Sequence, residues 1–205
     1  MYVDNQILDL FPTRLNLARH NDEMIEMEID RLVERCLDQE PSFNFNAEHN
    51  ETIDLFCERR AELLLFLPWL EGVVNKYLGH NHWKFTESWL NVYTTGGSQP
   101  PHNHLGCQVS GCYYHRTTPS MGPLVFHNPH NFVDLDLYGM QWKTFPVDTY
   151  PNSTILFPHW LKHSTEPNKD DSAKISIGFN ITIDPAPPGG ISGKWLGRNT
   201  KIHEP

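Results

Sequence analysis

From Trp83 onward, short stretches that favour β-structure alternate with turn-forming residues, and this pattern constrains the possible folds most strongly. Six strands are expected, over residues 85–93, 109–115, 122–126, 140–145, 153–157 and 173–183. Pairs such as Gly96-Gly97 and Pro100-Pro101 separate them. Many short strands joined by such turns are typical of a sandwich or a barrel, and not of a sheet built from strand–helix–strand units.

The first 80 residues carry helical signals instead. Residues Asn21-Asp22-Glu23 can cap a helix, and the apolar positions that follow have the spacing of one helix face: Ile25, Ile29, Leu32, Val33 and Cys36. A second helix is expected from about Glu51, with an interruption or restart at Pro68 and an end near Gly79.

These patterns predict a single domain over residues 1–205. Residues 1–80 would form a mostly helical segment that packs on the core, and residues 83–183 would form the β core. Residues 184–205 are rich in proline and glycine and are expected to form a tail. The helical segment could also offer a surface for a homodimer.

Charge and composition exclude some classes of function. The 25 acidic residues exceed the 16 basic ones, which gives a net charge of −9, so a nucleic-acid partner is not expected. The four cysteines include no Cys-x-x-Cys pair, and we expect reduced thiols in a cytoplasmic protein. Neither a signal peptide nor an apolar stretch of membrane-spanning length is apparent, so no membrane association is expected.

The chain contains 12 histidines, and two of them stand two residues apart at His102 and His104. Residues i and i+2 of a strand point to the same face, so these imidazoles could chelate one metal ion. Later in the chain, His159 or His163 could complete the site from a distant strand. The same spacing at His80-Asn81-His82 is expected to mark a surface turn.

The last predicted strand contains Lys174 and Ser176 on one face, among residues that otherwise favour burial. A buried lysine requires an anionic partner, because an unpaired buried charge is costly. The partner could be an acidic residue of the chain, such as Asp170, Asp171 or Asp184. It could also be the carboxylate of a cosubstrate.

Taken together and in order, several segments resemble the non-haem iron, 2-oxoglutarate-dependent oxygenases. The closest resemblance is to a poorly characterised bacterial and phage group of 2OG-Fe(II) oxygenases, and it covers roughly residues 84–183. The segments are Leu10-Phe11-Pro12-Thr13, Glu87-Ser88-Trp89-Leu90-Asn91-Val92-Tyr93, His102-Asn103-His104, Ser110-Gly111-Cys112-Tyr113-Tyr114, Gly122-Pro123-Leu124-Val125-Phe126, Phe157-Pro158-His159-Trp160-Leu161-Lys162-His163 and Lys174-Ile175-Ser176.

The resemblance implies a mainly β fold with N-terminal helices and a double-stranded β-helix core, a cupin-like jelly roll. It implies an Fe(II) site formed by His102, His104 and His163. It implies that Lys174 binds the far carboxylate of 2-oxoglutarate. Further candidates for binding this cosubstrate are Ser176, Tyr93, Asn91 and Tyr113.

The activity implied by the resemblance is that of a dioxygenase that uses molecular oxygen and 2-oxoglutarate. It would hydroxylate a peptide, an amino acid or a small metabolite and release succinate and carbon dioxide. No catalytic residue beyond the metal ligands is implied.

One position departs from the family pattern. His104 stands where most members of the superfamily carry Asp or Glu. Three neutral imidazoles would leave the site with the ion's two positive charges, which dianionic 2-oxoglutarate would balance. Alternatively, Asp134 or Asp136 supplies a carboxylate ligand from a loop, and His127 and His130 are further rivals to His104.

Three other functions stay open. One is an iron dioxygenase with three histidines that does not use 2-oxoglutarate, although such chemistry needs no lysine like Lys174. Another is a zinc hydrolase, although no general base is evident near the histidines. The last is a non-enzymatic, metal-binding jelly-roll module.

Overall fold

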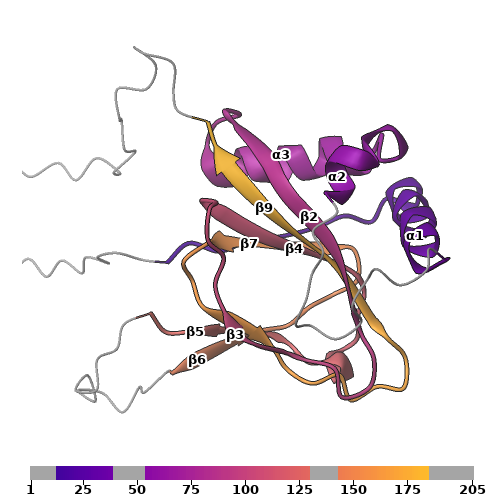
Figure 1. The fold of residues 1–205 in the computed structure, drawn as a ribbon, viewed down its shortest axis with the longest axis vertical. Coiled ribbons are helices and arrows are strands. Elements are labelled where there is room, and N and C mark those ends of the chain that lie inside the picture. The colour runs from indigo at the N-terminus through magenta and orange to yellow at the C-terminus, as the bar shows by residue number, and fades with distance from the viewer. Residues whose placement is uncertain (1–12, 39–53, 130–142, 185–205) are drawn as a thin grey trace, which may run out of the picture.

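Two antiparallel β-sheets lie face to face, and helices cover the outer face of the larger sheet (Figure 1). The structure is a computed structural model that describes residues 13–38, 54–129 and 143–184. This arrangement confirms the expected mainly β jelly roll with N-terminal helices. No helix in the described ranges is long and apolar enough to cross a membrane.

The larger sheet has five strands and the smaller sheet has four. In spatial order, the larger sheet consists of β1 (Asn16–Arg19), β7 (Ser153–Pro158), β4 (Val109–Arg116), β9 (Lys174–Ile183) and β2 (Trp83–Tyr93). The smaller sheet consists of β3 (Gln99–His102), β8 (His163–Thr165), β5 (Leu124–His127) and β6 (Thr144–Val147). The strand order is not the chain order, since β3, β5, β6 and β8 cross to the second sheet.

Between β1 and β2, the described residues form three α-helices: α1 (Glu23–Asp38), α2 (Leu55–Glu58) and α3 (Phe66–Leu78). Short 3-10 turns cover Arg60–Glu62 and Pro119–Met121. Helix α1 begins where predicted, because the Asp22 carboxylate accepts the backbone N–H groups of Met24 and Ile25. Its five buried residues are those that the spacing predicts.

The second helical region differs from its prediction. In place of one long helix, the described part contains α2, a 3-10 turn and α3, and the expected start at residues 51–53 lies outside the described residues. Pro68 lies in the first turn of α3, where its missing N–H removes no helical hydrogen bond. Gly79 ends the helix with a φ of 79°, as its position predicted.

The strands β2, β4, β5, β7 and β9 match five predicted strands to within two residues at each end. The sixth was predicted at 140–145, but the observed β6 covers Thr144–Val147, and residues 140–142 lie outside the described ranges. Strands β1, β3 and β8 were not predicted, because they are three or four residues long and β3 contains Pro100-Pro101. Proline is tolerated in β3 because this strand lies at the edge of its sheet.

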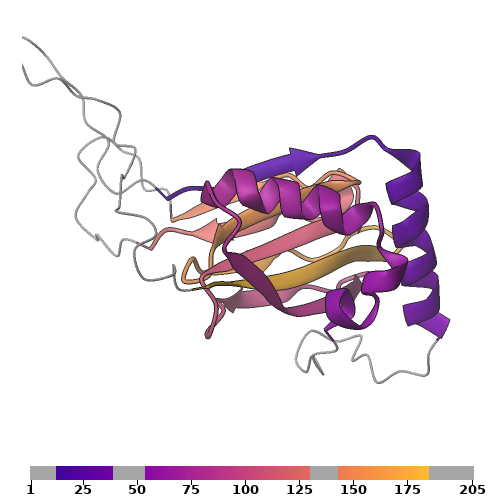
Figure 2. The ribbon, with the colours of Figure 1, turned by 90° about the horizontal axis from the view of Figure 1, so that it is seen from above.

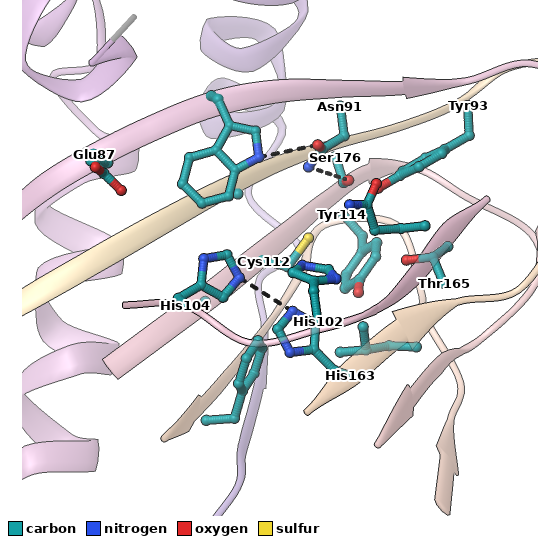
Figure 3. Close-up of a pocket in the computed structure, with 16 residues that line it drawn as sticks. Glu87, Asn91, Tyr93, His102, His104, Cys112, Tyr114, His163, Thr165 and Ser176 are labelled. Atoms are coloured by element: carbon teal, nitrogen blue, oxygen red, sulfur yellow. Dashed lines mark hydrogen bonds between the residues drawn. The ribbon is translucent and has the colours of Figure 1, made fainter. Parts of the chain in front are cut away.

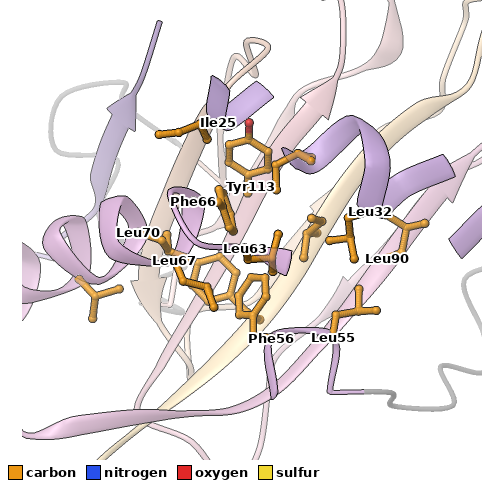
Figure 4. Close-up of a cluster of buried hydrophobic side chains, with 14 of the residues drawn as sticks. Ile25, Leu32, Leu55, Phe56, Leu63, Phe66, Leu67, Leu70, Leu90 and Tyr113 are labelled. Atoms are coloured by element: carbon orange, nitrogen blue, oxygen red, sulfur yellow. The ribbon is translucent and has the colours of Figure 1, made fainter. Parts of the chain in front are cut away.

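The main hydrophobic core lies between the larger sheet and the helices. Figure 2 shows α3 lying across this sheet, with α1 along one side of the molecule. Aromatic rings from the two layers pack against each other (Figure 4). The ring centroids of Phe56 in α2 and Phe179 in β9 are 5.5 Å apart, and those of Phe66 in α3 and Tyr113 in β4 are 4.9 Å apart. The helices therefore bury the outer face of the sheet and leave its inner face toward the smaller sheet.

A β-bulge in β2 decides which side chains reach that inner face. Phe85 pairs with Ile181 and Glu87 pairs with Asn180, so Thr86 is an extra residue in β2. Because of this extra residue, Phe85 packs in the helix-facing core, whereas Glu87 lies on the inner face. Without the bulge, residues two apart would share a face.

Candidate metal centre and cosubstrate pocket

A pocket lies between the two sheets, and three histidines meet on one of its walls (Figure 3). Within the described residues, the only group of three or more potential metal ligands consists of His102, His104 and His163. One ligand atom from each lies within 4.8 Å of the other two. These are the three residues that the family resemblance implies as iron ligands.

Strand pairing brings two of these histidines together from distant parts of the chain. His102 ends β3 and His163 begins β8, and the two residues stand directly opposite each other in the antiparallel pair. Their ring centroids are 4.3 Å apart. The short strands β3 and β8, which sequence patterns did not reveal, are therefore the elements that assemble the site.

The third histidine is held by its backbone. The His104 N–H donates to the His159 carbonyl (3.1 Å), and His159 Nδ1 lies 2.9 Å from the His104 carbonyl. These bonds tie His104 to the turn before β8. His159 thus positions the third histidine through the backbone and is not itself part of the three-histidine group.

In His102 and His163, the hydrogen bond of one ring nitrogen leaves the other nitrogen free to bind a metal ion. Nδ1 of His102 lies 2.8 Å from the Pro100 carbonyl, and Nδ1 of His163 lies 3.0 Å from the Leu161 carbonyl. Each Nδ1 must carry the proton to donate to a carbonyl, which leaves Nε2 as the electron-pair donor. Nε2 of His104 lies 3.3 Å from Nε2 of His163, near the roughly 3 Å expected for two nitrogens that bind one ion at right angles.

Burial keeps two of the imidazoles neutral at physiological pH. Burial, with the neighbouring His102 as a second cause, lowers the pKa of His104 to about 4 and that of His163 to about 3. A metal ion needs the neutral imidazole as its ligand, so these residues are ready to bind without losing a proton. The donor set therefore fits a transition metal such as Fe(II).

The larger sheet supplies the opposite wall of the pocket. Alternate residues of β2 point into it: Glu87, Trp89, Asn91 and Tyr93. They pair in register with Asn180, Gly178, Ser176 and Lys174 of β9. The wall is thus a row of side-chain pairs that runs from an acidic residue at one end to a basic residue at the other.

Trp89 is the residue of this row that contacts a candidate metal ligand. Its indole stacks on His104 with 5.6 Å between ring centroids, and its N–H donates to Asn91 Oδ1 (3.1 Å). The Asn91 amide in turn points at Ser176 Oγ (3.4 Å). The ring passes so close to Gly178 that a Cβ there would lie 2.5 Å from the indole, so this position requires glycine.

Lys174 is fully buried where this row ends, beside the inner face of β4. Its Nζ donates to the Gly122 carbonyl (2.6 Å) and lies 5.2 Å from the centre of the Tyr114 ring. None of the acidic residues in the described ranges forms an ion pair with it, and burial lowers its pKa to about 8. The sequence-based partners Asp170, Asp171 and Asp184 bond elsewhere or lie exposed.

Of the five predicted cosubstrate residues, three line the pocket and two, Lys174 and Tyr113, do not. Tyr93, Asn91 and Ser176 line it, but Tyr113 lies on the opposite face of β4, fully buried among helix residues and 3.0 Å from His20 Nε2. Its neighbour Tyr114 lines the pocket instead. Both faces of β4 are buried, so hydrophobicity alone could not show which tyrosine points inward.

Other predicted residues fall elsewhere. His127 bonds to Ser164 Oγ (2.9 Å) and is not part of the three-histidine group, and His80 and His82 lie in a turn before β2. Asp134, Asp136 and His130 lie outside the described residues. Sequence reasoning did not assign Glu87, Trp89, Cys112 or Thr165 to the pocket. Alternate residues of a strand share a face, so the position of Asn91 could have indicated Trp89 and Glu87.

The comparisons with known proteins now bear on this geometry. Residues 87–180 match the family model described as "Putative 2OG-Fe(II) oxygenase", a span that contains all three histidines and Lys174. This match supports the assignment of the chain to the 2OG-Fe(II) oxygenase superfamily. The comparison with curated proteins finds no significant match.

Solved structures share the fold at low sequence identity. The chain is similar to SnoK, a non-haem α-ketoglutarate-dependent carbocyclase from nogalamycin biosynthesis (TM-score 0.63, 14% identity, covering 84% of this chain and 80% of SnoK). It is similar to HygX of Streptomyces hygroscopicus with nickel and 2-oxoglutarate bound (TM-score 0.58, 12% identity, 83% of each chain). It is also similar to a prolyl-4-hydroxylase of Pseudomonas putida (TM-score 0.52, 13% identity, 83% and 89%).

The matched family implies an oxygenase with Fe(II) as cofactor and with 2-oxoglutarate and molecular oxygen as cosubstrates. The donor set of the three-histidine wall fits the metal. The family match, the fold and the three-histidine group agree with the expectation of a metal-binding jelly roll with oxidoreductase chemistry.

Proposed function

We propose that this oxygenase hydroxylates a peptide, an amino acid or a small metabolite, with His102, His104 and His163 as the metal ligands and Lys174 as the anchor of 2-oxoglutarate. The observation that carries the proposal is the buried charge of Lys174 beside the pocket whose opposite wall carries the three histidines. A dicarboxylate with one end at the metal and the other at Lys174 would give the metal a ligand and give Lys174 a negatively charged partner.

The surroundings of Lys174 support an anionic ligand. A buried ammonium group without a carboxylate is costly, and one backbone carbonyl and one aromatic ring offset only part of that cost. Gly122, whose carbonyl faces Nζ, has a φ of 77°, and a Cβ there would lie 2.6 Å from the Glu166 carbonyl oxygen. The local backbone is thus shaped to place this acceptor, and a ligand carboxylate would supply the missing charge.

Neutral donors next to Lys174 would complete the cosubstrate site. The Ser176 hydroxyl and the Asn91 amide lie in the row that links Lys174 to Trp89. Tyr93 is nearly buried, and burial raises its pKa, so its hydroxyl keeps its proton and can donate. We propose that these residues and Tyr114 orient the 2-oxoglutarate chain.

The residues of the chain would position and protect the reaction. When bound, Fe(II) with 2-oxoglutarate and oxygen supplies the oxidising chemistry. The three imidazoles hold the ion without a negative charge, so the charge that balances it comes from the cosubstrate. Trp89 and Phe157 flank the histidines with apolar rings and restrict the access of water.

Hydroxylation is the reaction we propose, and product analysis tests it. SnoK is a carbocyclase and the Pseudomonas protein is a hydroxylase, so the shared fold accommodates different outcomes. A product that gains one oxygen atom by mass spectrometry supports hydroxylation. A cytoplasmic location and a homodimer formed through the N-terminal helices stay predictions of the sequence, which cell fractionation and light scattering test.

Anaerobic reconstitution with Fe(II) and 2-oxoglutarate tests the proposed site. We expect a visible metal-to-ligand absorption band, then slow succinate release when air is admitted. We expect His163→Ala to abolish metal binding and both signals, while His82→Ala, which alters an exposed histidine, leaves them unchanged. Metal binding without the band and without succinate would contradict the role of 2-oxoglutarate and favour a three-histidine dioxygenase or a non-catalytic metal module.

A further inference from the structure

A second charged residue that has no charged partner among the described residues lies at the other end of the pocket wall. Glu87 pairs in register with Asn180, whereas Tyr93 pairs with Lys174, so six residues of β9 separate the two ends of the row. At roughly 3.3 Å per residue this is about 20 Å. Among the lining residues in the described ranges, Glu87 is the only carboxylate.

Buried polar side chains hold the Glu87 carboxylate in place, and Figure 3 shows it at the opposite end of the pocket from Tyr93. The Ser110 hydroxyl donates to Asn180 Oδ1 (2.9 Å), and the Asn180 amide donates to Glu87 Oε2 (2.7 Å). Ser110 is 1% exposed and Asn180 is 2% exposed, so this relay crosses three strands inside the protein. It fixes one carboxylate oxygen and leaves Oε1 without a hydrogen-bond partner among the described residues.

The charge itself has no function in this relay. A glutamine at position 87 could accept the same bond from Asn180 through its amide oxygen. None of the lysines and arginines in the described parts of the chain forms an ion pair with Glu87. A half-buried carboxylate that is oriented but lacks a counter-ion is suited to accept hydrogen bonds from a cation, because charge-assisted hydrogen bonds are the strongest available to it.

We propose that Glu87 determines substrate specificity by binding a cationic nitrogen, an ammonium or a guanidinium group, of the substrate. This inference rests on the proposed function, since it places 2-oxoglutarate at the Lys174 end and the substrate at the Glu87 end. The metal ligands lie between the two ends, next to Trp89. The substrate class is therefore a basic amino acid, a basic residue of a peptide, or a small amine.

The test uses the full chain loaded with Zn(II) and 2-oxoglutarate, with n-butylguanidinium and n-butylammonium as probes and n-butylurea as their neutral match. Binding is measured by NMR titration, with the Trp89 indole N–H as a reporter. We expect saturable binding of the cations, at least tenfold tighter than that of n-butylurea. We expect Glu87→Gln to weaken cation binding tenfold or more, whereas Glu58→Gln, which neutralises an exposed carboxylate of α2, has no effect.

Two results would overturn the inference: equal binding of cations and n-butylurea by the unaltered protein, or unchanged cation binding by Glu87→Gln. The first needs no variant, so misfolding cannot obscure it. A separate titration with 2-oxoglutarate distinguishes the two proposals. If 2-oxoglutarate binds and the cations do not, only the substrate class is wrong; if 2-oxoglutarate does not bind, the proposed function is wrong.

Discussion

The two faces of the larger sheet are built from the same strands and have opposite chemistry. On the helix-facing side, β4 and β9 present Tyr113, Ile177 and Phe179, which are fully buried in the main core. On the pocket-facing side, β9 presents Lys174 and Ser176, which are almost as inaccessible to solvent. These residues of β4 and β9 are therefore buried alike on both faces, and what differs is whether the buried groups have partners.

This difference separates stability from function. The apolar face stabilises the fold through burial and ring packing. The polar face reduces stability, since it desolvates a lysine and leaves hydrogen-bonding groups to be completed by ligands. Substitutions on the two faces should consequently affect different measurements.

The largest effect is expected on the apolar face. Phe56→Ala removes a ring that contacts Phe66, Phe85 and Phe179, and it should lower the free energy of unfolding by about 3–5 kcal/mol. Chemical denaturation measures this loss. The 2-oxoglutarate affinity of the folded fraction should change less than about twofold, and a larger change would show that the two faces are coupled.

The opposite pattern is expected on the polar face. Lys174→Met keeps the length and packing of the side chain but removes its charge. We expect about 30-fold or greater loss of 2-oxoglutarate affinity by calorimetry, because one partner of a buried charge pair is missing. The free energy of unfolding of the ligand-free protein should rise, since a desolvated charge has been removed. A fall in stability would mean that Lys174 is already paired in the ligand-free protein.

The pH dependence of binding sharpens the same point. Lys174 is protonated in the folded protein below about pH 8, so 2-oxoglutarate affinity should be constant below that value and fall about tenfold per pH unit above it. The unfolded chain keeps the lysine proton to a higher pH and binds more protons between pH 8 and 10. Stability of the ligand-free protein should therefore rise with pH in this window. Lys174→Met should show neither dependence.

The smallest effect compares two adjacent tyrosines. Tyr114→Phe alters the pocket face and should lower 2-oxoglutarate affinity a few-fold. Tyr113→Phe removes a hydroxyl that contacts His20 and Asn152, so it should cost about 1 kcal/mol of stability and leave affinity unchanged. Calorimetry measures the 2-oxoglutarate affinity of both variants, and chemical denaturation measures their stability. If Tyr113→Phe lowers the affinity and Tyr114→Phe does not, Tyr113 is the cosubstrate residue after all.

Sequence patterns predicted what local chemistry determines. The cap at Asp22 and the spacing in α1 defined a helix, and runs of β-branched residues defined the long strands. The position of Lys174 in such a run predicted a buried charge, which is exceptional, and the structure shows this residue fully buried. The ordered motifs resemble those of a known family, and this resemblance implied that His102, His104 and His163 form one site.

Long-range pairing determines the rest, and the sequence does not show it. The strands β3 and β8 are too short to have a pattern, and only their register makes His102 and His163 neighbours. The assignment of Tyr113 failed because residues on both sides of β4 are buried, so neither face is marked by polarity. The position of Glu87 depends on a bulge that no local pattern identifies.

That bulge has an evolutionary consequence. Thr86 has no partner in β9, so its deletion would leave Phe85 opposite Ile181 and Glu87 opposite Asn180. Phe85 and Glu87 would then be neighbours in a regular strand and would keep their opposite faces. Loss of this single codon would therefore remove the bulge without moving the acidic end of the wall and without altering any metal ligand.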